Sequence, residues 1–460
     1  MIQKCLEVLL IPFVRIMLHI YFRQIEVAGK ERVPRGVPLI YTPNHFNSVI
    51  DGLLARVFLP HDPRPLAKST LWDIRLLRPL LVAVGAIPVY RQQDAIDESY
   101  AARNKGTFSA CYDALAEGAS IVLFPEGQSH SEPELQEIKT GAARIALGAE
   151  QRRGPLGIRI IPVGLTFDAK QRFRSRVLIS VGEPLDPLEG LGEANAEDRE
   201  AVKLLTRRIQ QGIKSVTLNY PSWEEANIMS RAADLYVKRS SRDEASSSLA
   251  AEFSAHKQLS DAYPLMKECY PRKVSRIVDA VNAYDRLLKV LSIRHEHVVQ
   301  EHPKLLQTIY SLRKLSLFVI RLPLALLGIF LNAAPYFLTT LVGQLKIQAD
   351  RASTAKLVAG LILYPLCWTL QSGMLENEFF PAYVWWILAP LSGVSSLLFR
   401  ERHAQLLEEL RTYLKLNNHA EMKQELEQRL ENICIEVTEL LAISAASQRS
   451  TGEWVTEDQI

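Results

Sequence analysis

The chain has 460 residues, enough for two or three domains, and 48% of them are hydrophobic while 23% are charged. This combination favours a soluble part joined to membrane segments. The net charge of +3 gives no bulk basic signal, so we expect no nucleic-acid partner. The five cysteines are odd in number and widely spaced, which argues against a disulfide framework or a zinc site and favours reduced thiols facing the cytosol.

Residues 4–23 carry apolar side chains at helical spacing, with charged residues on the opposite arc. Charges interrupt the segment too often for a membrane span, and no small-residue cleavage site follows it. We therefore predict an amphipathic helix over residues 1–24 that lies in the bilayer interface. The alternative is a soluble helix packed on the following domain.

From residue 25 to residue 220, short apolar runs alternate with helical patterns. This alternation predicts an α/β fold, with a central β-sheet flanked by helices. In such folds chemistry gathers in the loops at strand ends. The predicted strands are 39–42, 64–67, 82–90, 120–124, 158–167 and 177–181, and the predicted helices are 49–58, 107–116, 140–149 and 198–218.

Residues 38–51 (PLIYTPNHFNSVID) hold the first candidate site. His45 and Asp51 are six residues apart, which does not place two side chains on one helix face. His45 is therefore expected in the loop before a helix, and Asp51 in the first turns of that helix. A carboxylate that binds one imidazole nitrogen leaves the other free to take a proton from a hydroxyl. The alternative is that Ser48 caps the helix with Asp51 as its capping-box partner, and that His45 is an ordinary loop residue.

Three further stretches follow in order: residues 85–91 (GAIPVYR), 124–127 (FPEG) and 160–164 (IIPVG). With the His45 and Asp51 block they resemble the glycerolipid acyltransferases, which acylate glycerol-3-phosphate or lysophosphatidic acid. The resemblance covers about residues 25–220. The five residues between His45 and Asp51, where most members have four, look like a membrane-embedded branch of the glycerol-3-phosphate acyltransferases. So does the Gly-Gln-Ser-His run at residues 127–130, where most members have a Thr-Arg pair after the glycine.

The resemblance implies transfer of a fatty acyl group from acyl-CoA, a co-substrate, to glycerol-3-phosphate, with no cofactor. His45 is the expected general base and Asp51 orients it. A guanidinium binds phosphate bidentately, so Arg91 is the first candidate for the acceptor phosphate. The candidate substrate-binding residues are Asn44, Lys68, Arg91, Glu126, Gly127 and Lys139, and no metal ligand is expected.

Three alternatives to glycerol-3-phosphate acylation remain open. In the first, the acceptor is lysophosphatidic acid or another lysolipid, since a lysolipid and glycerol-3-phosphate both present a hydroxyl near a phosphate. A lipase-like hydrolase would need a nucleophile elbow, and Gly127-Gln128-Ser129 lacks the second glycine. In the third alternative the core is inactive and the chain is a membrane scaffold, which the presence of His45, Asp51 and Glu126 argues against.

Residues 221–314 are expected to form a helical insertion or linker. His295, His297 and His302 fall near its end, but the first two cannot share a helix face, so we expect a solvated surface there and not a metal site. The last segment, residues 401–460, is predicted to be a helical tail.

Residues 315–400 are predicted to form a C-terminal α-helical membrane region. Residues 322–343 are apolar but interrupted at 332–335 (NAAP), which predicts a re-entrant segment, and residues 357–375 and 379–399 are long enough to form a transmembrane hairpin. Lysines and arginines flank both ends of these segments. The distribution predicts a multi-pass membrane protein with its catalytic domain on the cytoplasmic face.

Overall fold

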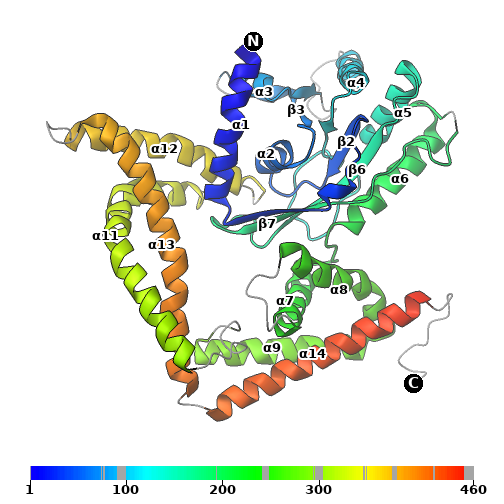
Figure 1. Ribbon diagram of the computed structural model, residues 1–460. Coiled ribbons are helices and arrows are strands. Elements are labelled where there is room, and N and C mark those ends of the chain that lie inside the picture. The colour runs from blue at the N-terminus through cyan, green and yellow to red at the C-terminus, as the bar shows by residue number, and fades with distance from the viewer. Residues whose placement is uncertain are drawn as a thin grey trace. The chain divides into compact units, whose positions relative to one another are not determined.

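The computed structural model describes residues 2–73, 75, 78–90, 100–192, 194–240, 248–293, 295, 304–345, 348, 350–375, 381–417 and 420–449. By their contacts the residues divide into two compact units (Figure 1). The first unit consists of Met1–Trp223, Ser248–Ala250 and Gln348–Thr354, and the second of Glu224–Ser247, Ala251–Ile347 and Ala355–Ile460. Two short segments that follow residue 220 in the sequence, Ser248–Ala250 and Gln348–Thr354, therefore belong to the first unit.

The first unit is built on a sheet whose strand order is β1-β7-β6-β2-β5-β3-β4 (Figure 1). All neighbouring strands are parallel except β6 and β7, which are antiparallel. Every residue of β2 is buried, as expected for an apolar strand with both faces covered. The strands are β1 Gln24–Ala28, β2 Leu39–Pro43, β3 Arg64–Lys68, β4 Ile87–Val89, β5 Ile121–Val122, β6 Arg159–Phe167 and β7 Arg176–Val181.

Helices flank this sheet and supply the rest of the core. Apolar faces of α4, α5 and α6 pack with β2, β5 and β6 in one buried cluster that includes Leu115, Ala146 and Leu205. Helix α6 begins after Asp198, whose carboxylate accepts the backbone N–H groups of the first turn at 3.1 Å. The helices of this unit are α1 Ile2–Tyr21, α2 Val49–Phe58, α3 Arg78–Ala83, α4 Tyr100–Ala116, α5 Gly141–Arg153 and α6 Arg199–Ser215, with 3-10 turns at Lys30–Arg32 and Ser69–Asp73.

The predicted α/β fold is confirmed, and two local predictions are corrected. The strand predicted at 82–90 is wrong in its first half, because α3 extends to Ala83 and the chain turns at Gly85, which has a φ of 67°. Only Ile87–Val89 is extended. Strand β1 was not predicted, because its residues alternate polar and apolar on a half-buried edge strand instead of forming an apolar run.

Helix α1 has apolar side chains on two faces. Val14 and Leu18 are buried against the domain, and the Arg15 guanidinium donates to the carbonyl of Val57 at 2.8 Å. Leu9 and Phe13 are exposed. The helix is thus packed on the domain and still presents an apolar surface, and its place in a bilayer interface stays a prediction.

The second unit is built from the helices from α7 onward. Helix α9 packs along α14, where the Lys273 ammonium lies 3.1 Å from the Glu439 carboxylate. His295 is buried and its Nδ1 lies 2.8 Å from the Tyr284 hydroxyl, so the predicted solvated surface is wrong at this residue. His297 and His302 lie outside the described residues. The helices are α7 Trp223–Ser240, α8 Leu249–Cys269, α9 Pro271–Leu291, α11 Lys304–Val342, α12 Ala352–Leu375, α13 Ala382–Asn417 and α14 Ala420–Arg449.

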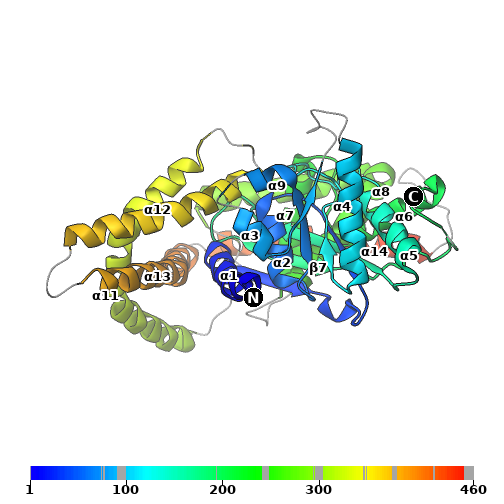
Figure 2. The ribbon, with the colours of Figure 1, turned by 90° about the horizontal axis from the view of Figure 1, so that it is seen from above.

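Three stretches of these helices are long and apolar enough to cross a membrane: Phe318–Val342, Ala352–Met374 and Ala382–Glu401 (Figure 2). The turn predicted at 332–335 is wrong, because α11 continues through it. Asn332 donates to the carbonyls of Gly328 and Ala389 at 2.9 and 3.1 Å, so its polar side chain is satisfied inside the helical unit. A helix that satisfies its own backbone groups is favoured over a turn in apolar surroundings. Helix α13 likewise continues past the predicted boundary at residue 400.

Candidate active site

The loops at one edge of the sheet bring together residues from distant parts of the sequence. Strands β6, β2, β5, β3 and β4 are mutually parallel, so their carboxyl ends lie at the same edge. His45 follows β2, Glu126 follows β5, Lys170 follows β6, and Lys68 is the last residue of β3. The expectation that chemistry gathers at strand ends therefore selects one region of the molecule.

His45 and Asp51 form a hydrogen-bonded pair at this edge. The His45 Nδ1 atom lies 2.9 Å from Asp51 Oδ2, and the backbone N–H of Asn47 donates to the same oxygen at 2.6 Å. The Asp51 side chain is fully buried, while the His45 side chain is 12% exposed. A carboxylate can only accept here, so Nδ1 carries the ring proton and Nε2 is left as the hydrogen-bond acceptor of the ring.

The capping alternative for this segment is wrong. Ser48 has a φ of 48° and makes no side-chain cap to α2, and the Asp51 carboxylate binds the backbone of Asn47 instead of Ser48. Asp51 lies in the first turn of α2, as predicted. The His45 ring also stacks on Phe124, with centroids 4.1 Å apart, which fixes its plane.

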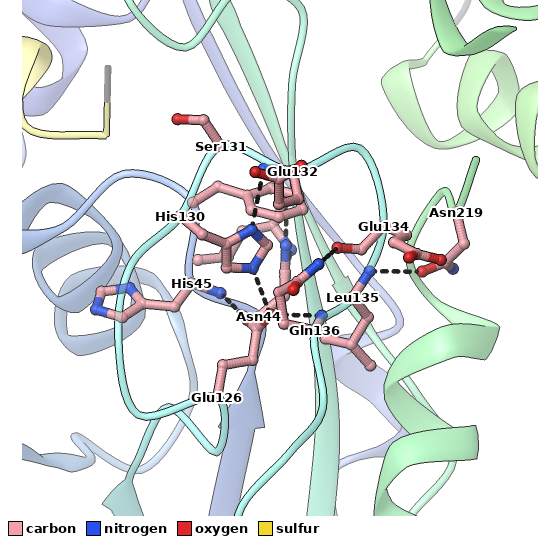
Figure 3. Close-up of polar contacts among 12 residues, drawn as sticks. Asn44, His45, Glu126, His130, Ser131, Glu132, Glu134, Leu135, Gln136 and Asn219 are labelled. Atoms are coloured by element: carbon pink, nitrogen blue, oxygen red, sulfur yellow. Dashed lines mark hydrogen bonds and ion pairs between the residues drawn. The ribbon is translucent and has the colours of Figure 1, made fainter. Parts of the chain in front are cut away.

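Glu126 holds the backbone of the histidine loop. Its Oε1 accepts the N–H of His45 at 2.7 Å, and its Oε2 accepts the N–H of Gln136 at 3.0 Å and binds Nε2 of His130 (Figure 3). His130 Nδ1 accepts the N–H of Glu132 at 3.1 Å, so Nε2 is the protonated nitrogen of that ring. The ring of His45 points away from this cluster in Figure 3. Glu126 is buried, and its geometry favours a positioning role over direct contact with a substrate.

Asn44 also differs from its predicted role. Its Nδ2 donates to the carbonyl of Leu165 at 3.2 Å, and its Oδ1 accepts the N–H of Leu165 at 2.7 Å. The residue is fully buried, so its amide is used to join the end of β2 to β6 and is not presented to a substrate. It positions the adjacent His45.

Gly127 and Lys139 lie against each other. Gly127 has a φ of 76°, a backbone conformation that favours glycine, and its Cα lies close to the exposed side chain of Lys139: a Cβ here would lie 2.8 Å from Lys139 Nζ. Lys139 is exposed, and its backbone N–H donates to the carbonyl of Pro125 at 2.8 Å. Lys68 is partly exposed and pairs in register with Val89 of β4. Arg91 lies outside the described residues, two positions after the end of β4, and its role stays a prediction.

Lys170 and Asp350 were not predicted from the sequence. The Lys170 ammonium donates to the carbonyls of Phe46 and His130, both at 3.1 Å, and to Ser131 Oγ at 2.8 Å. The available signal was its position three residues after β6. Asp350, in the segment Gln348–Thr354, accepts a hydrogen bond from the Ser129 hydroxyl, and no local pattern indicated this contact.

Part of this chain matches a known protein family. Residues 24–166 match the family model described as Acyltransferase, and this range contains His45, Asp51 and Glu126. Residues 24–166 are an acyltransferase domain. The fold prediction and the predicted family are thereby confirmed for this part of the chain.

Relatives of the acyltransferase domain include two Saccharomyces cerevisiae proteins. Glycerol-3-phosphate O-acyltransferase 2 is 27% identical over 292 residues, which cover 59% of this chain and 38% of that protein. Glycerol-3-phosphate O-acyltransferase 1 is 26% identical over 284 residues, which cover 60% and 36%. A chloroplastic 1-acyl-sn-glycerol-3-phosphate acyltransferase of Arabidopsis thaliana is 24% identical over 150 residues, which cover 32% and 38%. The chain spans less than two fifths of the length of each of these relatives.

Proposed function

We propose that this protein is a membrane acyltransferase that transfers a fatty acyl group from acyl-CoA to glycerol-3-phosphate. The observation that carries the proposal is the His45 and Asp51 pair, with 2.9 Å between Nδ1 and Oδ2 inside an acyltransferase domain. It leaves His45 Nε2 to accept the proton of the acceptor hydroxyl. An alcohol deprotonated in this way attacks a thioester carbonyl directly, so the chain needs no covalent intermediate.

The reaction balances with one base. As the hydroxyl oxygen forms its bond to the acyl carbon, its proton passes to Nε2 of His45. The C–S bond then breaks, and the coenzyme A thiolate takes that proton back from the imidazolium. Asp51, buried and negatively charged, stabilises the imidazolium between these two steps.

The acceptor phosphate needs cations, and three predicted residues serve this role in the proposal. Arg91 is the bidentate candidate, while Lys68 and Lys139 are the point charges. Lys68 is the last residue of a strand at the same sheet edge as His45, and Lys139 lies against Gly127 in the loop after β5. Glu126 and Asn44 act by holding the backbone on either side of the base.

The choice of glycerol-3-phosphate is supported by the two yeast relatives named glycerol-3-phosphate O-acyltransferases, which align over 292 and 284 residues. The plant relative, whose name indicates a 1-acylglycerol-3-phosphate acceptor, aligns over 150 residues. Lysophosphatidic acid is therefore the second candidate acceptor for the same chemistry.

We also propose that α11, α12 and α13 make the protein multi-pass, with the acyltransferase domain on the cytoplasmic face. Support comes from the three long apolar stretches and from the positive charges that flank them. The exposed apolar face of α1 is suited to the bilayer interface. A membrane location suits a reaction whose product is a lipid.

The proposal is tested with full-length protein in lipid nanodiscs, one acyl-CoA, and either glycerol-3-phosphate or lysophosphatidic acid. Free thiol and acylated product are both followed, so hydrolysis is distinguished from transfer. His45→Ala is expected to lose at least 100-fold in kcat, since general base catalysis contributes about 10²- to 10⁴-fold. The matched control is His256→Ala, which removes the histidine of another His and Asp pair, with 3.1 Å to Asp234. Transfer that persists unchanged in His45→Ala refutes the mechanism.

A further inference from the structure

Lys170 is a half-buried lysine with three acceptors around its ammonium group. Two are main-chain carbonyls, of Phe46 and His130, and the third is the hydroxyl of Ser131. Phe46 is the residue after the candidate base, and His130 and Ser131 belong to the loop after Glu126. A lysine ammonium has three protons, so all of them are used for holding these two loops together.

The backbone of the same residue makes two more contacts. Its carbonyl accepts Nδ2 of Asn47 at 3.3 Å and also the hydroxyl of Ser353. Asn47 in turn donates its N–H to the Asp51 carboxylate at 2.6 Å. The lysine is therefore hydrogen-bonded to the two residues that follow His45 in the sequence, Phe46 and Asn47.

Three carboxylates near the histidine loop also interact with the charge of this lysine. The carboxylates of Asp51, Asp350 and Glu132 face the Lys170 ammonium, and Asp51 makes the largest contribution of the three. Burial lowers the pKa of Lys170, and these carboxylates act in the opposite direction. The ammonium thus compensates part of the negative charge that surrounds the base.

We propose that Lys170 is a positioning residue for acyl transfer, which clamps the histidine loop (residues 44–48) against the loop at residues 127–131 and places a positive charge near Asp51. The inference rests on the proposed function, because positioning is meaningful only if His45 is the base. Lys170 lies four residues beyond the range matched by the family model. The proposal assigns Lys170 no contact with either substrate.

The clamp predicts a particular kinetic signature. Lys170→Met keeps most of the side-chain volume and removes the donors and the charge, so kcat is expected to fall by about 10- to 100-fold, as for a misplaced catalytic group. The KM values for acyl-CoA and glycerol-3-phosphate should stay within about twofold, because no substrate contact is lost. Without the cation the imidazolium form of His45 is favoured, so the acid limb of the kcat and pH profile should move to higher pH by about half a unit or more.

Two further variants separate the parts of the effect. Ser131→Ala removes one of the three acceptors and leaves the charge, so it should lower kcat by a few-fold without moving the acid limb. Lys203→Met is the matched control, since Lys203 is an exposed lysine on α6 that pairs with Glu200. Thermal unfolding of each variant reports whether the fold is retained.

The outcomes distinguish this inference from the proposed function. Folded Lys170→Met with wild-type kcat and an unmoved acid limb overturns the clamp, while His45→Ala remains inactive. If Lys170→Met does not fold, Ser131→Ala decides: reduced kcat with retained KM supports the clamp, and unchanged kcat overturns it. Wild-type protein that acylates neither acceptor refutes the proposed function itself.

Discussion

Asp51→Asn is the substitution that tests the geometry of the base most directly. Oδ2 of Asp51 accepts two hydrogen bonds, from His45 Nδ1 and from the N–H of Asn47. Oδ1 is buried and has no hydrogen-bond partner among the described residues. An asparagine keeps both bonds only if its amide oxygen occupies the Oδ2 position. The opposite orientation would place an amide N–H against the N–H of Asn47.

The magnitude follows from this orientation. With the oxygen in place the imidazole keeps its tautomer, but the imidazolium loses its negative partner. A hydrogen bond to a charged group contributes about 1.5–3 kcal/mol. That loss lowers kcat by about 10- to 150-fold, since about 1.36 kcal/mol corresponds to tenfold in rate. The amide nitrogen then sits unpaired at the Oδ1 position, which should lower the free energy of unfolding by about 1–3 kcal/mol.

The assay is acyl-CoA thiol release with glycerol-3-phosphate as acceptor, over a range of pH, together with thermal unfolding in the same nanodiscs. Asp234→Asn is the matched control, because Asp234 pairs with His256 at 3.1 Å in the second unit. The expected order of activity is wild type, then Asp51→Asn, then His45→Ala. An Asp51→Asn protein with wild-type kcat would show that the carboxylate does not assist the base, and the reasoning would fail.

Four other substitutions test the site and its support. Glu126→Gln replaces a buried carboxylate that accepts three hydrogen bonds, so kcat and the unfolding free energy should both fall, the latter by about 1–3 kcal/mol; a raised KM for the acceptor with unchanged kcat would favour direct substrate contact instead. Gly164→Ala would place a Cβ 1.8 Å from a backbone carbonyl oxygen, so it should destabilise the protein by several kcal/mol in thermal unfolding. Its control is Gly106→Ala, in a helix with open space around the glycine, which should be neutral or stabilising by up to about 1 kcal/mol. Burial raises the pKa of the Cys111 thiol from 9.0 to about 12. The stability that the neutral thiol contributes is therefore complete below pH 9 and is lost as pH rises toward 12, by about 1.4 kcal/mol per pH unit. Cys111→Ala should lose unfolding free energy less steeply above pH 9, and the same dependence of unfolding free energy on pH in the two proteins would contradict this.

Local patterns in the sequence predicted the parts of the site that are close together along the chain. The apolar run before Pro43, the six-residue separation of His45 and Asp51, and the helix over 49–58 together predicted that the two side chains meet, and they lie in hydrogen-bond contact. These features depend on periodicity and on steric preferences of neighbouring residues, which act within a few residues. The same reasoning predicted β6 and β7 almost to the residue.

Local patterns failed where polar side chains are used across long distances. Asn44 and Glu126 were predicted to bind the substrate. In the structure Asn44 binds Leu165, 121 residues away, and Glu126 binds the backbone of His45, 81 residues away. The break predicted from Asn332 is wrong for a related reason, because partners on α11 and α13 satisfy that side chain.

The sequence by itself thus determined the α/β alternation, the apolar helices and the histidine and aspartate of the candidate dyad. Only the tertiary structure decided that β2 lies between β6 and β5, and this order brings Lys170 and Glu126 to either side of the histidine loop. Strand order is set by the simultaneous packing of many residues that are far apart in the chain. A hydrogen bond between loops of neighbouring strands therefore has no signature in the residues around either partner.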